Sequence, residues 1–216
     1  MEISKIKEKC MNTIDIKERR FAPAVEAVND LLNDEEYMDE EVILIAIDGR
    51  SGSGKTRLSA FLAEKYDANV FHMDDFFLQE SQRTPERMAE IGGNVDYERF
   101  REEVLIPLWY GDDVVYRPFN CKTMKIEKEK EQVIKHKRIN IIEGSYSLHP
   151  YFGEPYQLKI FCDIDPESQM TNITTRICDD PEMLSKFKDT WIPKENEYFE
   201  KNKTLENSDV YIDWND

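Results

Sequence analysis

Residues 49 to 56 read Gly-Arg-Ser-Gly-Ser-Gly-Lys-Thr and match the phosphate-binding pattern G-x-x-x-x-G-K-[ST] in full. Glycines let the backbone bend around phosphate oxygens without a Cβ in the way. In such loops the lysine, here Lys55, reaches the β- and γ-phosphates, and the Thr56 hydroxyl binds Mg²⁺. The sequence therefore predicts a site for ATP and Mg²⁺ made by the whole loop: Gly49, Arg50, Ser51, Gly52, Ser53, Gly54, Lys55 and Thr56.

The segments on either side of the loop support this interpretation. The run 42–47 is almost purely apolar and β-branched, which is typical of a strand buried on both faces. The run 55–66 has apolar residues at helical spacing, and the N-terminus of a helix there would offer free N–H groups to an anion. A glycine-rich turn that binds nothing would not need a strand before it and a helix after it.

Composition limits the classes of function. The chain has 216 residues and a formal net charge of −16, which argues against a general nucleic-acid binder. No apolar run reaches the length of about 18 residues that a membrane span needs, and residues 1–20 lack the apolar core of a signal peptide. We therefore expect a cytoplasmic protein. The four scattered cysteines indicate free thiols rather than disulfides or a zinc site.

The order of patterns predicts an α/β protein with two parts. Residues 1–41 form an N-terminal helical extension, with helical pieces over 2–33 broken near Phe21-Ala22-Pro23 and an acidic connector after them. Residues 42–216 form the main domain, in which a mostly parallel sheet is covered by helices on both faces. Besides the segments around the loop, we expect strands at 69–73, 138–142, 157–164 and, at an edge, 210–212, helices at 97–108, 167–178 and 191–203, and extended segments or a hairpin at 114–135.

Acidic residues follow three of the expected strands, where ligands of a parallel sheet gather. Asp74 is our candidate for the base that takes a proton from an acceptor hydroxyl, and it could also contact the metal. Glu143 is the candidate for Mg²⁺ or its water shell. The alternatives are a helix N-cap for Asp74 and a loop acid without a metal role for Glu143. We interpret Asp163 and Asp165 as structural, because Asp before Pro is an ordinary helix start.

Several segments together resemble the uridine kinase family of P-loop small-molecule kinases, which is related to nicotinamide riboside kinases and phosphoribulokinases. The resemblance covers about residues 42–213. Its segments, in family order, are the phosphate loop, Met73-Asp74-Asp75-Phe76-Phe77, Asn94-Val95-Asp96-Tyr97 with Phe100, Ile141-Ile142-Glu143-Gly144, and Trp191-Ile192-Pro193 with Glu195 to Phe199. It implies the three-layer P-loop NTPase fold with a lid at about 176–190.

The resemblance also implies roles on the acceptor side of the site. Asp74 would activate the acceptor hydroxyl, Phe77 would lie near a nucleoside, and Asp96, followed by Tyr97, would bind ribose hydroxyls. A cap of the helix that starts at Tyr97 is an equal alternative for Asp96. Arg117 could touch substrate or phosphate, and an ordinary surface arginine is as good an interpretation. Asn120 stands where many relatives carry aspartate.

The main departure from the family lies in the lid. Relatives carry Arg-Arg-x-x-Arg-Asp where this chain reads Thr175-Arg176-Ile177-Cys178-Asp179-Asp180. Only Arg176 is left to steady the γ-phosphate, with Lys186 and Lys188 as partial substitutes that lack the guanidinium fork. This departure weakens the inference of uridine specificity.

These observations lead to two hypotheses of different classes. The first is an ATP- and Mg²⁺-dependent kinase for a small-molecule hydroxyl acceptor, with uridine or cytidine favoured and nicotinamide riboside, pantothenate or a sugar-like metabolite as alternatives. The second is a nucleotide-binding regulatory protein derived from such a kinase. A GTPase-like switch is disfavoured, because the chain has no N-K-x-D motif. Homo-oligomerisation through the N-terminal helices stays open.

Overall fold

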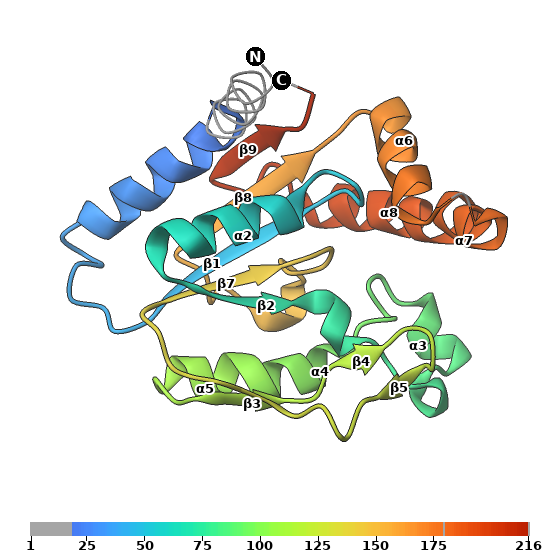
Figure 1. The fold of residues 1–216 in the computed structure, drawn as a ribbon, viewed down its shortest axis with the longest axis horizontal. Coiled ribbons are helices and arrows are strands. Elements are labelled where there is room, and N and C mark those ends of the chain that lie inside the picture. Colours follow the sequence, from blue (N-terminus) through green and yellow to red (C-terminus); the bar gives the residue numbers. More distant parts are fainter. Residues whose placement is uncertain (1–18, 179, 216) are drawn as a thin grey trace, which may run out of the picture.

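The computed structural model of the chain describes residues 19–178 and 180–215. Its centre is a five-stranded sheet in the order β2-β7-β1-β8-β9, and every neighbouring pair in it is parallel (Figure 1). The strands are β1 (Ile43–Gly49), β2 (Asn69–His72), β7 (Ile139–Glu143), β8 (Leu158–Asp163) and β9 (Val210–Asp213). The predicted parallel α/β sheet and the edge position of the last strand are confirmed.

The central strand β1 shows why the sheet needs cover on both faces. All seven of its residues are buried, and successive side chains point to opposite sides. Ile43, Ile45 and Ile47 belong to one hydrophobic cluster, whereas Leu44 and Ala46 belong to another. The strand buried on both faces that the β-branched run 42–47 predicts is therefore confirmed.

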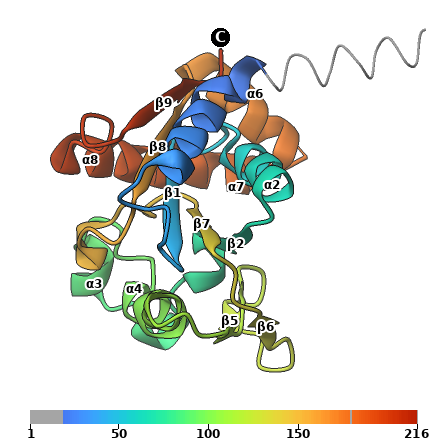
Figure 2. The ribbon, with the colours of Figure 1, turned by 90° about the vertical axis from the view of Figure 1, so that its left-hand side faces the viewer.

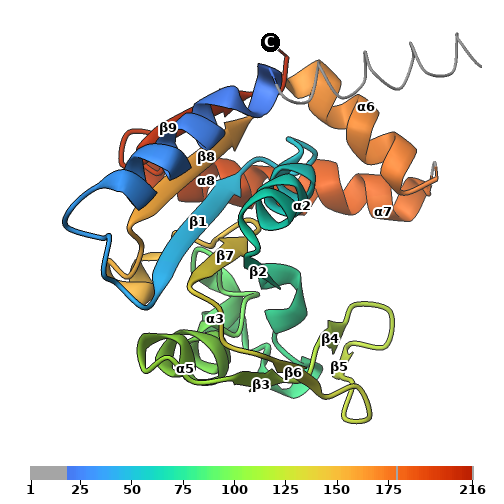
Figure 3. The same ribbon diagram turned by 60° about the vertical axis from the view of Figure 1, so that its left-hand side comes forward.

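One face of the sheet is covered by α2 (Lys55–Tyr66) and by a helix over residues 19–33 (Figure 3). Phe21, Ala24, Val28 and Leu31 of the latter helix are buried against the sheet. The predicted break near Phe21-Ala22-Pro23 is wrong, since the helix is continuous from 19 to 33. Burial of this apolar stripe outweighs the one backbone hydrogen bond that Pro23 cannot make. The part of the predicted 2–33 helix before residue 19 lies outside the described residues.

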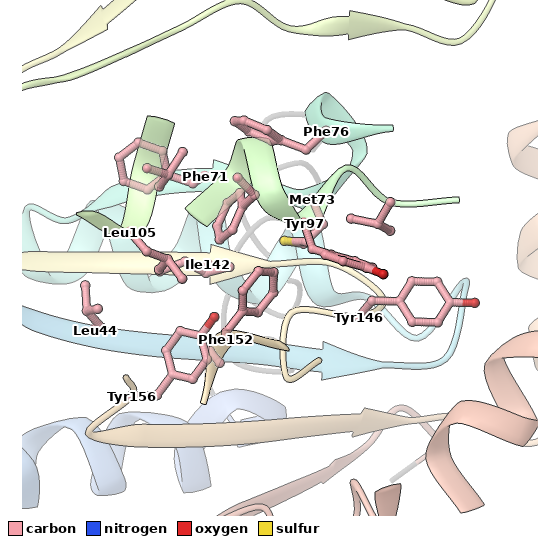
Figure 4. Close-up of a cluster of buried hydrophobic side chains, with 14 of the residues drawn as sticks. Leu44, Phe71, Met73, Phe76, Tyr97, Leu105, Ile142, Tyr146, Phe152 and Tyr156 are labelled. Carbon is pink, nitrogen blue, oxygen red and sulfur yellow. The ribbon is translucent and has the colours of Figure 1, made fainter. Parts of the chain in front are cut away.

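The other face packs on the segment 97–109 and on α8 (Ile192–Asn202). The predicted 97–108 helix is present as α4 (Tyr97–Phe100), a π-helical turn (Arg101–Leu105) and α5 (Ile106–Trp109). Figure 4 shows the aromatic-rich core beneath it, in which Phe71 and Ile142 of the sheet meet Phe76, Leu105 and Phe152. The structure thus has the three layers that the sequence predicts.

The remaining elements build an arm and a small outlying region. The arm comprises α6 (Pro166–Arg176), α7 (Pro181–Lys186), a π-helical turn (Phe187–Trp191) and α8. The small outlying region comprises α3 (Pro85–Ala89) and the strands β3 to β6, without α4 and α5, and it lies beyond the β2 edge, far from β9 and α6 (Figures 1 and 2). It contains two small antiparallel pairs where the sequence predicts extended segments or a hairpin: β3 (Val114–Tyr116) with β6 (Gln132–Ile134), and β4 (Phe119–Asn120) with β5 (Lys125–Ile126).

Short 3₁₀ turns complete the elements, at Met73–Phe76, Glu80–Gln82 and Pro150–Phe152. None of the helices in the described part of the chain combines the length and the apolar character that crossing a membrane requires.

Candidate nucleotide and acceptor site

The phosphate loop joins the carboxyl end of β1 to the N-terminus of α2. Gly49 and Gly54 have φ values of +135° and +84°, which side-chain-bearing residues rarely adopt. A Cβ on Gly49 would lie 2.0 Å from the backbone oxygen of Cys162, and one on Gly54 would lie 2.0 Å from the Trp214 ring. Both glycines are therefore required by close approach as well as by dihedral angle.

Lys55 and the start of α2 carry the positive character of the loop. The Lys55 ammonium is buried and donates to the backbone oxygens of Gly49 at 2.7 Å and Arg50 at 2.9 Å. No side chain caps α2 at Gly54, so its N-terminal N–H groups and partial positive charge face the loop. This arrangement suits an anion with several oxygens, as a triphosphate has.

Two of the three predicted metal ligands, Thr56 and Glu143, lie within hydrogen-bond distance of each other. Thr56 Oγ1 is 3.3 Å from Oε1 and 3.4 Å from Oε2 of Glu143, which ends β7 and is buried. Two oxygen-bearing side chains beside a phosphate loop fit Mg²⁺, which keeps several waters and takes substrate phosphates as further ligands. Among the residues that the structure describes, no group of three or more His, Cys, Asp or Glu side chains could hold a metal ion by itself.

His72 also contacts Glu143, which the sequence analysis did not foresee. Its Nδ1 lies 2.5 Å from Glu143 Oε1, and this hydrogen bond raises the pKa of His72, an effect that burial opposes. His72 is the last residue of β2, next to the strand that Glu143 ends. Its position at a strand end, two residues before Asp74, is the sequence signal that could have revealed this contact.

Asp74 lies in the 3₁₀ turn Met73–Phe76 that follows β2, where His72 and not Asp74 is the N-cap. Its side chain is exposed, and its carboxylate accepts no hydrogen bond from any residue that the structure describes. The surrounding protein nevertheless displaces water and raises the pKa of Asp74. The charge of Glu143 adds to this, while Lys55, Arg176 and His72 act in the opposite direction. Asp74, Glu143, Lys55 and Arg176 are therefore close enough to influence one another.

Arg176 is the last residue of α6, and its guanidinium lies 5.2 Å from the ring centroid of Phe187. It is exposed, as a group that must reach a ligand should be. Of the two lysines considered as substitutes, Lys186 forms an ion pair with Glu182 at 2.7 Å on the surface of α7, and Lys188 is exposed in the π-helical turn.

The acceptor-side residues have more varied surroundings. Phe77 is half-buried, with its ring centroid 6.1 Å from that of Phe119. Asp96 caps α4 by accepting from the Arg99 amide at 3.2 Å, and its Oδ2 accepts from Gln82 Nε2 at 3.1 Å. The cap interpretation is thus present in the structure, while ribose binding by Asp96 stays a prediction.

Tyr97 and Arg117 are engaged elsewhere in this structure. The buried Tyr97 donates its hydroxyl to Glu90 at 2.6 Å and stacks on His149. Arg117 is exposed and bonds to Glu131 and to the backbone oxygen of Lys128. Arg117 is thus a surface arginine in this structure. A substrate role for Tyr97 or Arg117 stays a prediction. The structural interpretation of Asp165 is confirmed, because it caps α6 through the amides of Glu167 and Ser168.

Asp48, which the sequence analysis passed over, is fully buried at the start of the loop. Its carboxylate accepts four hydrogen bonds, from the amides of Gly49, Tyr146 and Leu148 and from the Tyr198 hydroxyl. Burial raises the pKa of Asp48 to about 6, although the hydrogen bonds from Leu148, Tyr198 and Gly49 act to lower it. An acidic residue at the end of an apolar strand was the signal that could have revealed it.

Comparison with known proteins connects this geometry to a fold. No protein-family model and no curated protein sequence matches the chain. Solved structures do match. A possible uridine kinase from Bacillus stearothermophilus has a TM-score of 0.67 at 18% identity, covering 91% of this chain and 98% of that one. The chain has the P-loop kinase fold.

Two further P-loop kinase structures agree. A candidate fructose transport system kinase from Silicibacter sp. TM1040 has a TM-score of 0.57 at 18% identity, covering 86% of this chain and 95% of that one. D-glycerate 3-kinase from Cryptococcus neoformans var. grubii has a TM-score of 0.54 at 11% identity, covering 71% of this chain and 78% of that one. The acceptors in these names differ, so the shared fold does not select an acceptor for this chain.

Proposed function

We propose that the protein transfers the γ-phosphoryl group of ATP, with Mg²⁺, to a hydroxyl of a nucleoside or similar small metabolite in the cytoplasm. The observation that carries the proposal is the gathering of Lys55, Thr56, Glu143 and Asp74 at the carboxyl ends of β1, β7 and β2. A cation and a helix N-terminus for phosphates, oxygen ligands for a metal and an unpaired carboxylate for the acceptor are the parts that phosphoryl transfer needs.

Each residue has a distinct role in this proposal. Lys55 and the loop amides hold the triphosphate, and Thr56 and Glu143 bind Mg²⁺, directly or through water. When bound, the metal neutralises part of the charge on the phosphates. Asp74 orients the acceptor hydroxyl and takes its proton, and Arg176 steadies the charge on the transferring group.

The acceptor class follows from the residues that resemble the family. Phe77 offers an aromatic face, and Asp96 offers a carboxylate suited to two hydroxyl groups. To bind ribose hydroxyls, Asp96 would have to exchange its hydrogen bond from Gln82 for one from the ligand. Uridine or cytidine is favoured on this ground, followed by nicotinamide riboside, pantothenate and sugar-like acceptors.

The test is ADP release with Mg·ATP against uridine, cytidine, nicotinamide riboside, pantothenate and glycerate, with Asp74→Ala as the control. We expect turnover with one acceptor and its loss in the variant. Nucleotide binding without turnover on any acceptor would favour the regulatory alternative, for which the reduction of the lid arginines to Arg176 is the supporting observation.

A further inference from the structure

The backbone of the phosphate loop is held by side chains from outside the loop. The amide of Gly49 donates to Asp48 at 2.7 Å. The oxygens of Ser51 and Gly52 each accept at 3.0 Å, from Gln169 and Asn172 of α6. Side chains of β1 and α6 thus fix the peptide groups of Gly49, Ser51 and Gly52, in the first half of the loop.

Glu195 of α8 adds three further hydrogen bonds at the loop. Its carboxylate accepts from the Ser51 amide at 3.1 Å, from Ser51 Oγ at 2.6 Å and from Ser145 Oγ at 2.7 Å. The residue is only 5% exposed, and it forms no ion pair with any residue in 19–178 or 180–215. Three neutral donors therefore stabilise a buried carboxyl group that lies against an anion-binding loop.

A carboxylate close to a triphosphate repels it, so Glu195 would weaken ATP binding if its charge were its only effect. Its three hydrogen bonds indicate a structural role that offsets this repulsion. Ser51 belongs to the phosphate loop, and Ser145 comes two residues after Glu143. Glu195 therefore ties the loop to the segment that carries the proposed metal ligand. It also commits the Ser51 amide, which orients the peptide groups that follow.

We propose that Glu195 is a positioning residue that holds the phosphate loop in its nucleotide-binding conformation before ATP arrives, assisted by Gln169 and Asn172. The inference rests on the proposed function only in that the loop binds ATP. Asn172 and Arg176 lie one helical turn apart on α6. The contacts that fix the loop therefore also fix the position of the Arg176 backbone before ATP binds.

The variant Glu195→Gln separates positioning from charge. Glutamine keeps the shape but removes the negative charge, and its amide nitrogen cannot accept a hydrogen bond. The two serine hydroxyls must then turn to accept from that nitrogen, or the bond from the Ser51 amide is lost, and the charge-assisted bonds are replaced by weaker neutral ones. We expect the Kd for Mg·ATP, measured by calorimetry without an acceptor, to rise about tenfold or more. If Glu195 contributed only repulsion, the same change would tighten binding.

The matched control is Glu197→Gln, which removes the same charge from the exposed face of α8. We expect its Kd for Mg·ATP to stay within about twofold of wild type. In turnover assays, Glu195→Gln should lower kcat/KM for ATP while leaving the KM of the acceptor nearly unchanged. A general structural defect would instead change both parameters and lower the melting temperature in the absence of nucleotide.

Ser145→Ala covers the case in which Glu195→Gln fails to fold. It removes one neutral donor and should raise the Kd for Mg·ATP by about two- to fivefold. Equal affinities in Glu195→Gln, Glu197→Gln and wild type, or an unchanged Kd in Ser145→Ala, would overturn the inference. Wild-type protein that binds ATP without phosphorylating any acceptor would contradict the proposed function and leave the role of Glu195 intact.

Discussion

Asp74 and Glu143 are carboxyl groups with different surroundings, which suit different tasks in the proposed reaction. Glu143 is buried and already shared by Thr56 and His72, which suits a fixed metal ligand. Asp74 is exposed and accepts no hydrogen bond among the described residues, so it is free to receive a proton from an incoming hydroxyl. The difference lies in the partners of each carboxylate and not in residue type.

The variant Asp74→Asn tests the base. It should lower kcat by about 10² to 10⁴, because the amide keeps the shape but cannot take the proton. The Kd for Mg·ATP should change little, since Lys55 and the loop amides are untouched. Steady-state kinetics and nucleotide titration on the same preparation measure both. A kcat within threefold of wild type would remove Asp74 from the reaction.

Asp48 should make stability depend on pH. Its pKa is about 6 in the folded protein against 3.8 ordinarily, so the folded state binds the proton more tightly than the unfolded chain. The associated stabilisation is complete below about pH 4 and is lost as the pH rises through about 6. Between pH 4.5 and 7, the free energy of unfolding of wild type should fall by about 1 to 2 kcal/mol relative to Asp48→Asn. Urea unfolding across this range measures the difference, and a constant difference would contradict it.

Among the elements, α6 connects the phosphate loop to the segment 176–190, where the sequence predicts a lid. Its N-terminus is capped by Asp165, its middle contacts Ser51 and Gly52 through Gln169 and Asn172, and its last residue is Arg176. Because the middle of the helix is fixed to the loop, the position of Arg176 at its end is tied to the phosphate loop as well. We propose that this anchoring lets the single Arg176 act on the phosphate without further lid arginines.

Arg176→Ala should lower kcat by at least about 100-fold, since a cation on the transferring phosphoryl group is worth several kcal/mol in such sites. Arg176→Lys should recover only part of the loss, because the ammonium lacks the guanidinium fork. Lys201→Ala, an exposed change on α8, is the control and should stay near wild type. Steady-state kinetics of the three variants measure these changes in kcat. Equal kcat values in Arg176→Ala and Lys201→Ala would show that Arg176 does not contribute to phosphoryl transfer.

At the scale of the whole molecule, the helix over residues 19–33 belongs to the core on one face of the sheet. Phe21 is 1% exposed, and its ring lies 5.4 Å from Phe61 of α2 and 6.3 Å from Trp214, which itself packs on Gly54. The segment before the first strand therefore helps support the phosphate loop from behind.

Phe21→Ala should lower the free energy of unfolding by about 3 to 5 kcal/mol, the usual cost of emptying a buried phenylalanine site. Urea denaturation measures it, with the exposed Glu26→Ala on the same helix as a control. A cost below about 1 kcal/mol would mean that the helix packs loosely and contributes little to the domain.

Much of this architecture could be predicted from the sequence because its signals are local. The runs 42–47 and 55–66 carry their own periodicity, and Lys55, Thr56, Asp74 and Glu143 follow from a motif and from strand ends. Contacts between distant positions carry no such signal. Glu195 reaches Ser51 across 144 residues and Tyr198 reaches Asp48 across 150, so only the folded chain reveals these partners. The unbroken helix at Pro23 was missed for the same reason, since tertiary burial outweighed a local preference.

The central claim is that a γ-phosphoryl group passes from ATP to a small-molecule hydroxyl. The most direct measurement follows γ-labelled Mg·ATP with each acceptor, uridine first, and separates labelled acceptor from free phosphate. We expect one labelled phosphate per acceptor molecule in wild type and none with Asp74→Asn. Label found only in inorganic phosphate, at a rate that no acceptor changes, would contradict the account.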